Sequence, residues 1–207
     1  MKKIFGLVAL SSIVLMALPA YAEQHEIIGE NSGDITINGT LGIDNTDEDA
    51  TIVEEDDAWI NVTLPLDTIF YSASPKAGAP ITSPDYTITN NSGRPVDIHF
   101  KGIAKDDPDS SAKAVYMVEL NGFSKANPKI IEGGLATSAS NGVLIHTLAN
   151  NNGKLAKDDP SELNTTANTV TFGYVGEVTD AMDGDTITEN YTMTLEFKAV
   201  SWSGDTP

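Results

Sequence analysis

The sequence predicts an all-β protein, an antiparallel β-sandwich of immunoglobulin-like or jelly-roll-like type with about eight to nine strands. Three observations lead to this fold class. After the N-terminal leader, apolar and polar residues alternate in short runs, helical periodicity is almost missing, and clusters of Gly, Pro and Asn separate the runs. The 207 residues are 40% hydrophobic, which is enough for one core. A closed β-barrel is the alternative that this pattern leaves open.

The clearest run is Tyr191–Ala199, where apolar and polar residues alternate without a break. Because successive side chains of a strand point to opposite faces, the apolar residues of this run share one face. They are Tyr191, Met193, Leu195, Phe197 and Ala199. This pattern is typical of an antiparallel strand with one side in a core. We therefore expect Leu195 and Phe197 to be buried, and Thr194 and Glu196 to face solvent.

Shorter patterns predict the other strands. In chain order these are Asp34–Ile43, Trp59–Leu64, Tyr86–Thr89, Val96–Phe100, Ala114–Leu120, Val143–Leu148 and Thr169–Val175. The clusters Asn91-Ser92-Gly93 and Asp183-Gly184-Asp185 have the composition of tight turns. Polar stretches near 104–113 and 150–168 predict two long loops within a single domain that covers residues 23–207.

The first 22 residues have the organisation of a signal peptide. Lys2-Lys3 is a positive region, Ile4–Leu18 is an apolar run, and Pro19-Ala20-Tyr21-Ala22 supplies small residues for cleavage. The apolar run is short for a membrane-spanning helix, and an uncleaved anchor is the alternative. We therefore expect residues 1–22 to be removed and the mature chain to begin at Glu23. The expected location is extracellular or at the cell surface.

The chain is strongly acidic and contains no cysteine. Its formal net charge is −18, and removal of the two lysines of the leader makes it −20. This charge repels nucleic acid and anionic membranes, so neither is an expected partner. It suits a cell-wall polymer or other surface proteins as partners. Without disulfides, an exported protein depends on packing for its stability, and thiol catalysis is excluded.

Acidic residues concentrate in the stretch Asp44–Asp57, where eight of fourteen positions carry a carboxylate. So many charges cannot be buried together, so we predict a solvated loop or a cation site. Calcium is the attractive ligand because it prefers oxygen donors. However, Asp44–Asp49 lacks the glycine that an EF-hand loop has at its sixth position. We favour the solvated loop and assign no metal ligand.

No motif marks a catalytic or cofactor-binding site. The histidines are His25, His99 and His146, and neither an HExxH nor a GxSxG motif is present. His99 and His146 lie in strand patterns, on the side expected to face solvent. Trp59 and Trp202 could stack on sugars, but packing in a core or against a partner is the favoured interpretation. The sequence therefore predicts a non-enzymatic protein without a cofactor and without catalytic, cofactor-binding or metal residues to name.

Three segments resemble secreted Gram-positive surface proteins. Asn61–Phe70 and Ser83–Ile98 are similar to a pattern in which a V-x-x-P strand precedes strands ending I-x-N-x-S and beginning P-V-x-V. Tyr191–Phe197 resembles the closing strand of WxL-type wall-binding domains and of the TasA/camelysin group of matrix-fibre proteins. The chain departs from the WxL motif, because Trp59 is followed by Ile-Asn and Trp202 by Ser-Gly. The resemblance implies an extracellular β-sandwich with a structural or adhesive role.

These features predict a non-enzymatic secreted or cell-surface structural or interaction protein, which binds a wall polymer or assembles with copies of itself. A carbohydrate- or calcium-binding module is the alternative, and an unrecognised hydrolase is a third. For self-assembly, Glu23–Asn38 carries Ile35 and Ile37 in alternation and could pair with an open sheet edge of a neighbouring molecule. The alternative is that Asp34–Ile43 pairs within its own domain.

Overall fold

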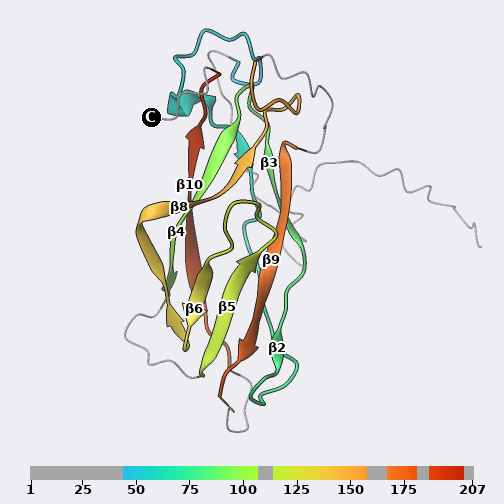
Figure 1. Ribbon diagram of the computed structural model, residues 1–207, viewed down its shortest axis with the longest axis vertical. Helices are drawn as coiled ribbons and strands as arrows, with labels where there is room; N and C mark the ends of the chain where they lie inside the picture. Colours follow the sequence, from blue (N-terminus) through green and yellow to red (C-terminus); the bar gives the residue numbers. More distant parts are fainter. Residues whose placement is uncertain (1–43, 107–113, 158–166, 181–186, 203–207) are drawn as a thin grey trace, which may run out of the picture. The chain divides into compact units, whose positions relative to one another are not determined.

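The computed structural model describes residues 44–106, 114–157, 167–180 and 187–202. These residues form ten strands, a 3-10 turn at Asp57–Trp59 (η1) and no α-helix, and the strands make two antiparallel sheets (Figure 1). The predicted all-β, sandwich-like fold is therefore confirmed. The described strands form two separate sheets, whereas the alternative prediction was a single sheet closed into a barrel. The leader, the predicted strand Asp34–Ile43, His25 and the predicted turn at 183–185 lie outside the described residues.

The larger sheet has seven strands. Their order is β1-β3-β9-β5-β6-β7, and β2 also pairs with β9. All of these pairings are antiparallel. The strands are β1 Val62–Thr63, β2 Pro80–Ile81, β3 Tyr86–Asn90, β5 Tyr116–Asn121, β6 Lys129–Glu132, β7 Leu135–Ala136 and β9 Thr169–Val178.

The smaller sheet has three strands in the order β10-β4-β8. They are β4 Val96–Lys105, β8 Ser138–Leu148 and β10 Tyr191–Ala199. β10 has the bounds that the alternation predicts, and it pairs with β4 along all of its nine residues. The register shifts between Thr194 and Leu195. Within the described residues, β10 and β8 are therefore the edges of this sheet.

The core lies between the two sheets and is built from their inner faces. From the smaller sheet, Ile98 and Phe100 of β4 and Ile145 of β8 are buried. The larger sheet contributes Ile88, Val118, Leu120 and Phe172. Burying one such side chain stabilises the fold by about 1.5–3 kcal/mol relative to leaving it exposed. The alternation along each strand therefore determines which of its faces is covered.

The two sheets are joined on one side. Thr137 lies between β7 and β8, where its N–H donates to the carbonyl of Ile130 in β6 at 2.9 Å. Its own carbonyl accepts the N–H of Ile103 in β4 at 3.0 Å, so this residue links the larger sheet to the smaller. On the other side, where β10 ends the smaller sheet, residues 64–75 run past the gap between the sheets without forming a strand.

Two strands, β4 and β8, each extend five residues beyond the predicted bounds. β4 continues past Phe100 to Lys105, and β8 begins at Ser138 rather than at Val143. The expected loop from residue 104 is therefore wrong for Ala104 and Lys105, which pair with β10. The polar run that begins at Lys105 misled the prediction, because backbone pairing with β10 holds this end of the strand whatever its side chains are.

Other differences concern short elements. β2, β6 and β7 have two to four residues each, too few to show an alternating pattern, and they bring the number of strands to ten. The predicted strand Trp59–Leu64 is reduced to Val62–Thr63. Trp59 instead ends η1, whose N-cap Asp56 accepts a backbone N–H from the turn.

Candidate functional site

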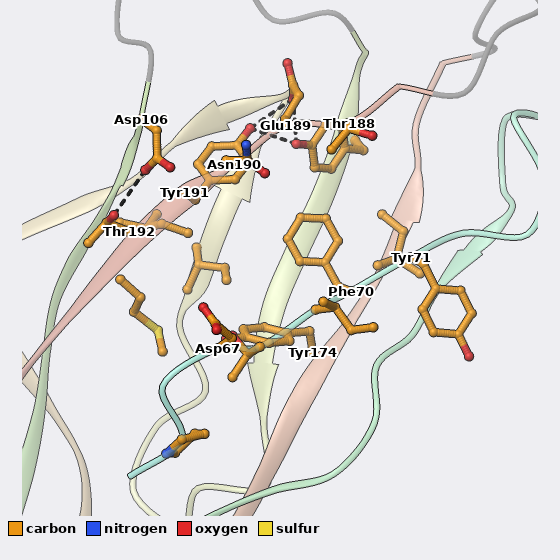
Figure 2. Close-up of a pocket in the computed structure, with 18 of the residues that line it drawn as sticks. Asp67, Phe70, Tyr71, Asp106, Tyr174, Thr188, Glu189, Asn190, Tyr191 and Thr192 are labelled. Atoms are coloured by element: carbon orange, nitrogen blue, oxygen red, sulfur yellow. Dashed lines mark hydrogen bonds between the residues drawn. The ribbon is translucent and has the colours of Figure 1, made fainter. Parts of the chain in front are cut away.

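A groove opens between the two sheets on the side where no described residue joins them. Its volume is about 1130 Å³. β10 forms one wall, the inner face of the larger sheet forms the other, and residues 64–75 form the outer lip. Figure 2 shows Glu189 and Tyr191 at one end, with Phe70 and Tyr174 further along. This volume is slightly larger than that of typical ligand-binding pockets, which span about 300–1,000 Å³.

β10 turns alternate side chains toward this groove. Tyr191, Met193, Leu195 and Phe197 are half-buried and pack against the core. Thr192, Thr194 and Lys198 on the other face are exposed. The predicted alternation is confirmed, but Leu195 and Phe197 are not fully buried as expected, because open space rather than the larger sheet lies over part of their surface. Glu196 lies on the outer face as expected but is half-buried rather than exposed, with its carboxylate 3.7 Å from the amines of Lys101 and Lys198.

The lip of the groove exposes apolar surface. Leu66 is 81% exposed, Ile69 is 60% exposed and Tyr71 is 53% exposed. Phe70, between the last two, instead packs its ring 5.9 Å from the ring of Tyr174 inside the groove. Exposed apolar side chains that gather beside a groove mark an interaction surface.

One end of the groove is polar and buried. The side chain of Glu189 is only 3% exposed, and its Oε1 lies 2.7 Å from Nζ of Lys105. Its Oε2 accepts the hydroxyl of Tyr116 at 2.7 Å and that of Tyr191 at 3.0 Å. The two hydroxyl oxygens are 2.7 Å apart. Because a buried carboxylate is costly without partners, these contacts hold all four side chains in one arrangement.

Both tyrosines of this cluster stay protonated at neutral pH. Burial raises the pKa of Tyr191 to about 12, and the neighbouring Glu189 carboxylate adds to the rise. Burial also raises the pKa of Tyr116, together with its hydrogen bonds to Tyr191 and Glu189. The hydroxyls therefore act as donors to Glu189, and the ring of Tyr191 is fixed at the end of the groove.

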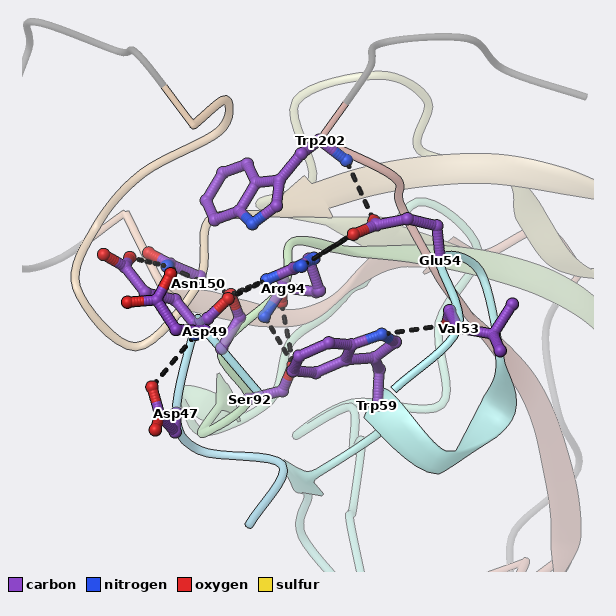
Figure 3. A network of polar contacts seen from close by, with 11 residues as sticks. Asp47, Asp49, Val53, Glu54, Trp59, Ser92, Arg94, Asn150 and Trp202 are labelled. Carbon is purple, nitrogen blue, oxygen red and sulfur yellow. Dashed lines mark hydrogen bonds and ion pairs between the residues drawn. The ribbon is translucent and has the colours of Figure 1, made fainter. Parts of the chain in front are cut away.

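A second cluster lies at the end of the sandwich where β4 begins. Arg94 is clamped between two tryptophan rings, with its guanidinium carbon 4.1 Å from the centroid of Trp59 and 4.9 Å from that of Trp202 (Figure 3). Oε1 of Glu54 accepts from Nη2 at 2.6 Å, and the carbonyl of Glu48 accepts from Nη1 at 2.6 Å. The backbone N–H of Trp202 also donates to Oε2 of Glu54 at 3.2 Å. Arg94 thereby ties the acidic stretch and the chain after β10 to the sandwich.

The acidic stretch is thus more than a solvated loop. The hydrogen bond from Arg94 holds the pKa of Glu54 below its ordinary value. Burial raises the pKa of Glu48, but hydrogen bonds led by that from Lys154 outweigh it, so the pKa is lowered. The remaining six carboxylates of the stretch are exposed. Among the described residues, no group of three or more His, Cys, Asp or Glu side chains comes together to hold a metal ion.

Trp59 and His146, considered from the sequence as sugar-binding and catalytic candidates, instead make contacts within the fold. Trp59 is completely buried and donates its ring N–H to the carbonyl of Val53 at 3.0 Å, so its faces are closed to a sugar. His146 is half-buried rather than solvent-facing, burial lowers its pKa, and its Nδ1 accepts the N–H of Ser124 at 3.2 Å. The Ser124 hydroxyl lies 3.0 Å from the same nitrogen, but neither residue lines the groove. His99 is half-buried in β4.

Comparisons with protein-family models, with curated proteins and with solved structures found no match. The resemblance to WxL-type domains and to the TasA/camelysin group therefore stays a prediction. In the described part of the chain, no helix has the length and apolar character needed to cross a membrane. The groove and its surroundings are what remain to indicate a function.

No site residue was predicted from sequence, and the groove was missed. Glu189 is 84 residues from Lys105 and 73 from Tyr116, and each of the three is an ordinary residue at or near a strand end. The available signal was β10 itself, because its strict alternation requires a cover for its apolar face. Only the sheet order shows that the residues described by the structure cover this face incompletely.

Proposed function

We propose that this protein is an exported, non-enzymatic surface protein that assembles with copies of itself. In the assembly, an extended segment of one copy lies in the groove of the next and adds a strand to β10. The observation that carries the proposal is that, among the described residues, β10 has one edge without a partner strand, beside a groove that apolar side chains line in part. Export is supported by the signal-peptide pattern of residues 1–22.

The edge of β10 favours strand addition. An edge strand carries unpaired N–H and C=O groups on the side away from its neighbour, and in the described part of the chain β10 pairs only with β4. Its nine residues extend for about 30 Å at ~3.3 Å per residue. An added strand would satisfy these backbone groups and cover the half-buried side chains of β10, which is the β-augmentation mode of peptide binding.

The chain encodes a segment suited to this groove. Asp34–Ile43 is predicted to be a strand from its alternation, with Ile35 and Ile37 on one face. Its ten residues are one more than the nine of β10, so it is long enough to pair along the whole strand. Burial of each isoleucine would contribute about 1.5–3 kcal/mol. We therefore take the occupant to be this segment of a second copy.

The acidic charge acts against assembly when salt is low. Two mature copies each carry a formal charge of −20 and repel one another. Because dissolved ions screen this repulsion, assembly strengthens as ionic strength rises. Light scattering of the mature chain in low and high salt therefore tests the proposal directly. Monomers in every condition would leave a solitary domain that binds a wall polymer as the better account.

Point variants of the mature chain separate strand uptake from other contacts. Ile35→Asn with Ile37→Asn removes the apolar face of the segment and is expected to abolish assembly. Thr36→Asn is the matched control, because it changes the opposite face of the same segment and leaves assembly in place. Equal behaviour of the two variants would contradict the proposal.

Mixing two variants tests whether the strand comes from another copy. The Ile35→Asn/Ile37→Asn chain keeps an intact groove, and a Leu195→Asp chain keeps the segment but has a charged groove. Each alone is expected to remain monomeric, while the mixture forms heterodimers. Circular dichroism first confirms that Leu195→Asp keeps its fold. A mixture that stays monomeric, when the parent chain assembles, would rule out strand exchange through this groove.

A further inference from the structure

The half-buried face of β10 has a characteristic order of side-chain sizes. Tyr191 and Phe197 are six positions apart at its two ends, and the aliphatic Met193 and Leu195 lie between them. All four pack against the core and line the groove. A strand taken up by β10 would therefore meet a ring, two aliphatic side chains and a second ring, in that order.

The segment before the described residues has the complementary order. Gly33 and Gly39 are also six positions apart, and Ile35 and Ile37 lie between them on the same face of the predicted strand. A glycine is the only residue without a side chain, so it leaves room for a large neighbour across the strand pair. An aromatic ring that covers a glycine also protects its exposed backbone.

The ring of Tyr191 cannot move aside for a larger residue. Its hydroxyl donates to Glu189 at 3.0 Å and lies 2.7 Å from the hydroxyl of Tyr116. Glu189 is itself held by Lys105 at 2.7 Å and is almost completely buried. The polar cluster therefore fixes the position of the Tyr191 ring, so a strand that pairs with β10 must fit the ring where it stands.

Resting on the proposed uptake of a strand from a second copy, we propose the register in which that strand pairs with β10. Gly33 and Gly39 lie opposite the two aromatic residues of β10, and Ile35 and Ile37 lie opposite Met193 and Leu195. Both patterns are symmetric about their centres. Thr36 therefore lies opposite Thr194 whether the strands run parallel or antiparallel.

Disulfide trapping measures this register, because the chain contains no cysteine of its own. A mature chain with Thr36→Cys is mixed under oxidising conditions with a chain that carries Thr192→Cys, Thr194→Cys or Lys198→Cys, three exposed positions of β10. Mixed dimers, identified by mass, are expected to form most with Thr194→Cys. Glu132→Cys on β6, which has a 65% exposed side chain, is the control for random collision.

Each outcome of the trapping experiment is informative. A maximum at Thr192→Cys or Lys198→Cys would overturn the register while strand uptake stands. Mixed dimers no more frequent than with Glu132→Cys would overturn both proposals. A disulfide within one chain that carries Thr36→Cys and Thr194→Cys, without mixed dimers, would show that the segment serves its own molecule and would overturn the second copy as its source.

Glycine substitutions give an independent measurement by light scattering. Gly33→Val and Gly39→Val are each expected to raise the concentration needed for assembly about tenfold, which corresponds to about 1.4 kcal/mol, because the added side chain crowds the aromatic ring across the strand pair. Gly29→Val, outside the register, is the control. Valine favours strands more than glycine does, so without the aromatic neighbours the same substitutions would strengthen assembly. Unchanged or stronger assembly would overturn the proposed register.

Discussion

The guanidinium carbon of Arg94 lies 4.1 Å from the centre of the Trp59 ring, and Trp202 covers its other side at 4.9 Å. The arginine side chain is 6% exposed, so its charge depends on Glu54 for neutralisation. Glu54 also accepts the N–H of Trp202. Arg94 and Glu54 therefore hold both the acidic stretch and the chain after β10 against the sandwich. We expect loss of these contacts to lower the free energy of unfolding of the whole domain.

Removal of the carboxylate tests this anchor. Glu54→Ala leaves Arg94 buried between the rings without its counter-ion, so we expect the free energy of unfolding to fall by about 1.5–3 kcal/mol. Glu132→Ala is the control, because it breaks an exposed pair with Lys129 that is worth about 0–1 kcal/mol. Urea unfolding measures both. Equal losses would show that the Arg94 cluster carries no special weight.

The loss of stability at acidic pH should depend on Glu48 and Glu54. Both pKa values are lowered in the folded state from an ordinary value of 4.5. Their contribution is therefore complete above pH 4.5 and is lost as the pH falls through the folded-state values. We expect the melting temperature to drop in this range, and to drop less steeply in a Glu48→Gln/Glu54→Gln variant. Parallel curves would contradict the assignment.

The loss of stability at alkaline pH should depend on Tyr191. Its pKa is 10.0 in the unfolded chain and about 12 in the folded one, so the folded state keeps a proton that the unfolded state loses. Stability is therefore expected to fall as the pH rises above 10, and Tyr191→Phe should reduce this fall. The half-exposed Tyr71 supplies the control variant Tyr71→Phe. Urea midpoints measured across this range would be identical for both variants if the cluster were unimportant.

Truncations along the two sheets should reflect the groove. Ile98→Ala removes a fully buried side chain and should cost about 2–5 kcal/mol. Leu195→Ala should cost less, about 1–2 kcal/mol, because the leucine is half-buried at the groove. Thr194→Ala on the exposed face should cost about 0.5 kcal/mol or less. Equal effects at Leu195 and Thr194 in thermal unfolding would refute the one-sided burial of β10.

Export makes a prediction of its own. N-terminal sequencing of protein secreted by the native host should find Glu23 first, because cleavage after Ala22 follows the small-residue pattern of the leader. The cell-associated fraction, washed in high salt, is the comparison sample. An intact chain beginning at Met1 and embedded in membrane would refute the prediction.

Several strands were predictable from the sequence alone. β10 has the predicted bounds, and the predicted β3, β5 and β9 lie within a few residues of those observed. The reason is that a strand with one buried face has an apolar residue at every second position, and this alternation is visible in the sequence. β2, β6 and β7 show no such alternation, since two to four residues are too few to establish a period.

Only the tertiary structure decided how these strands are arranged and what they leave uncovered. Periodicity shows that Leu195 needs a cover, but it does not show that β10 is the last described strand of its sheet, beside a groove. Likewise, nothing local pairs Lys105 with Glu189 or sets Arg94 between Trp59 and Trp202. Such contacts depend on which distant strands become neighbours. Sheet order follows from the packing of the whole core, whereas alternation is a property of each strand by itself.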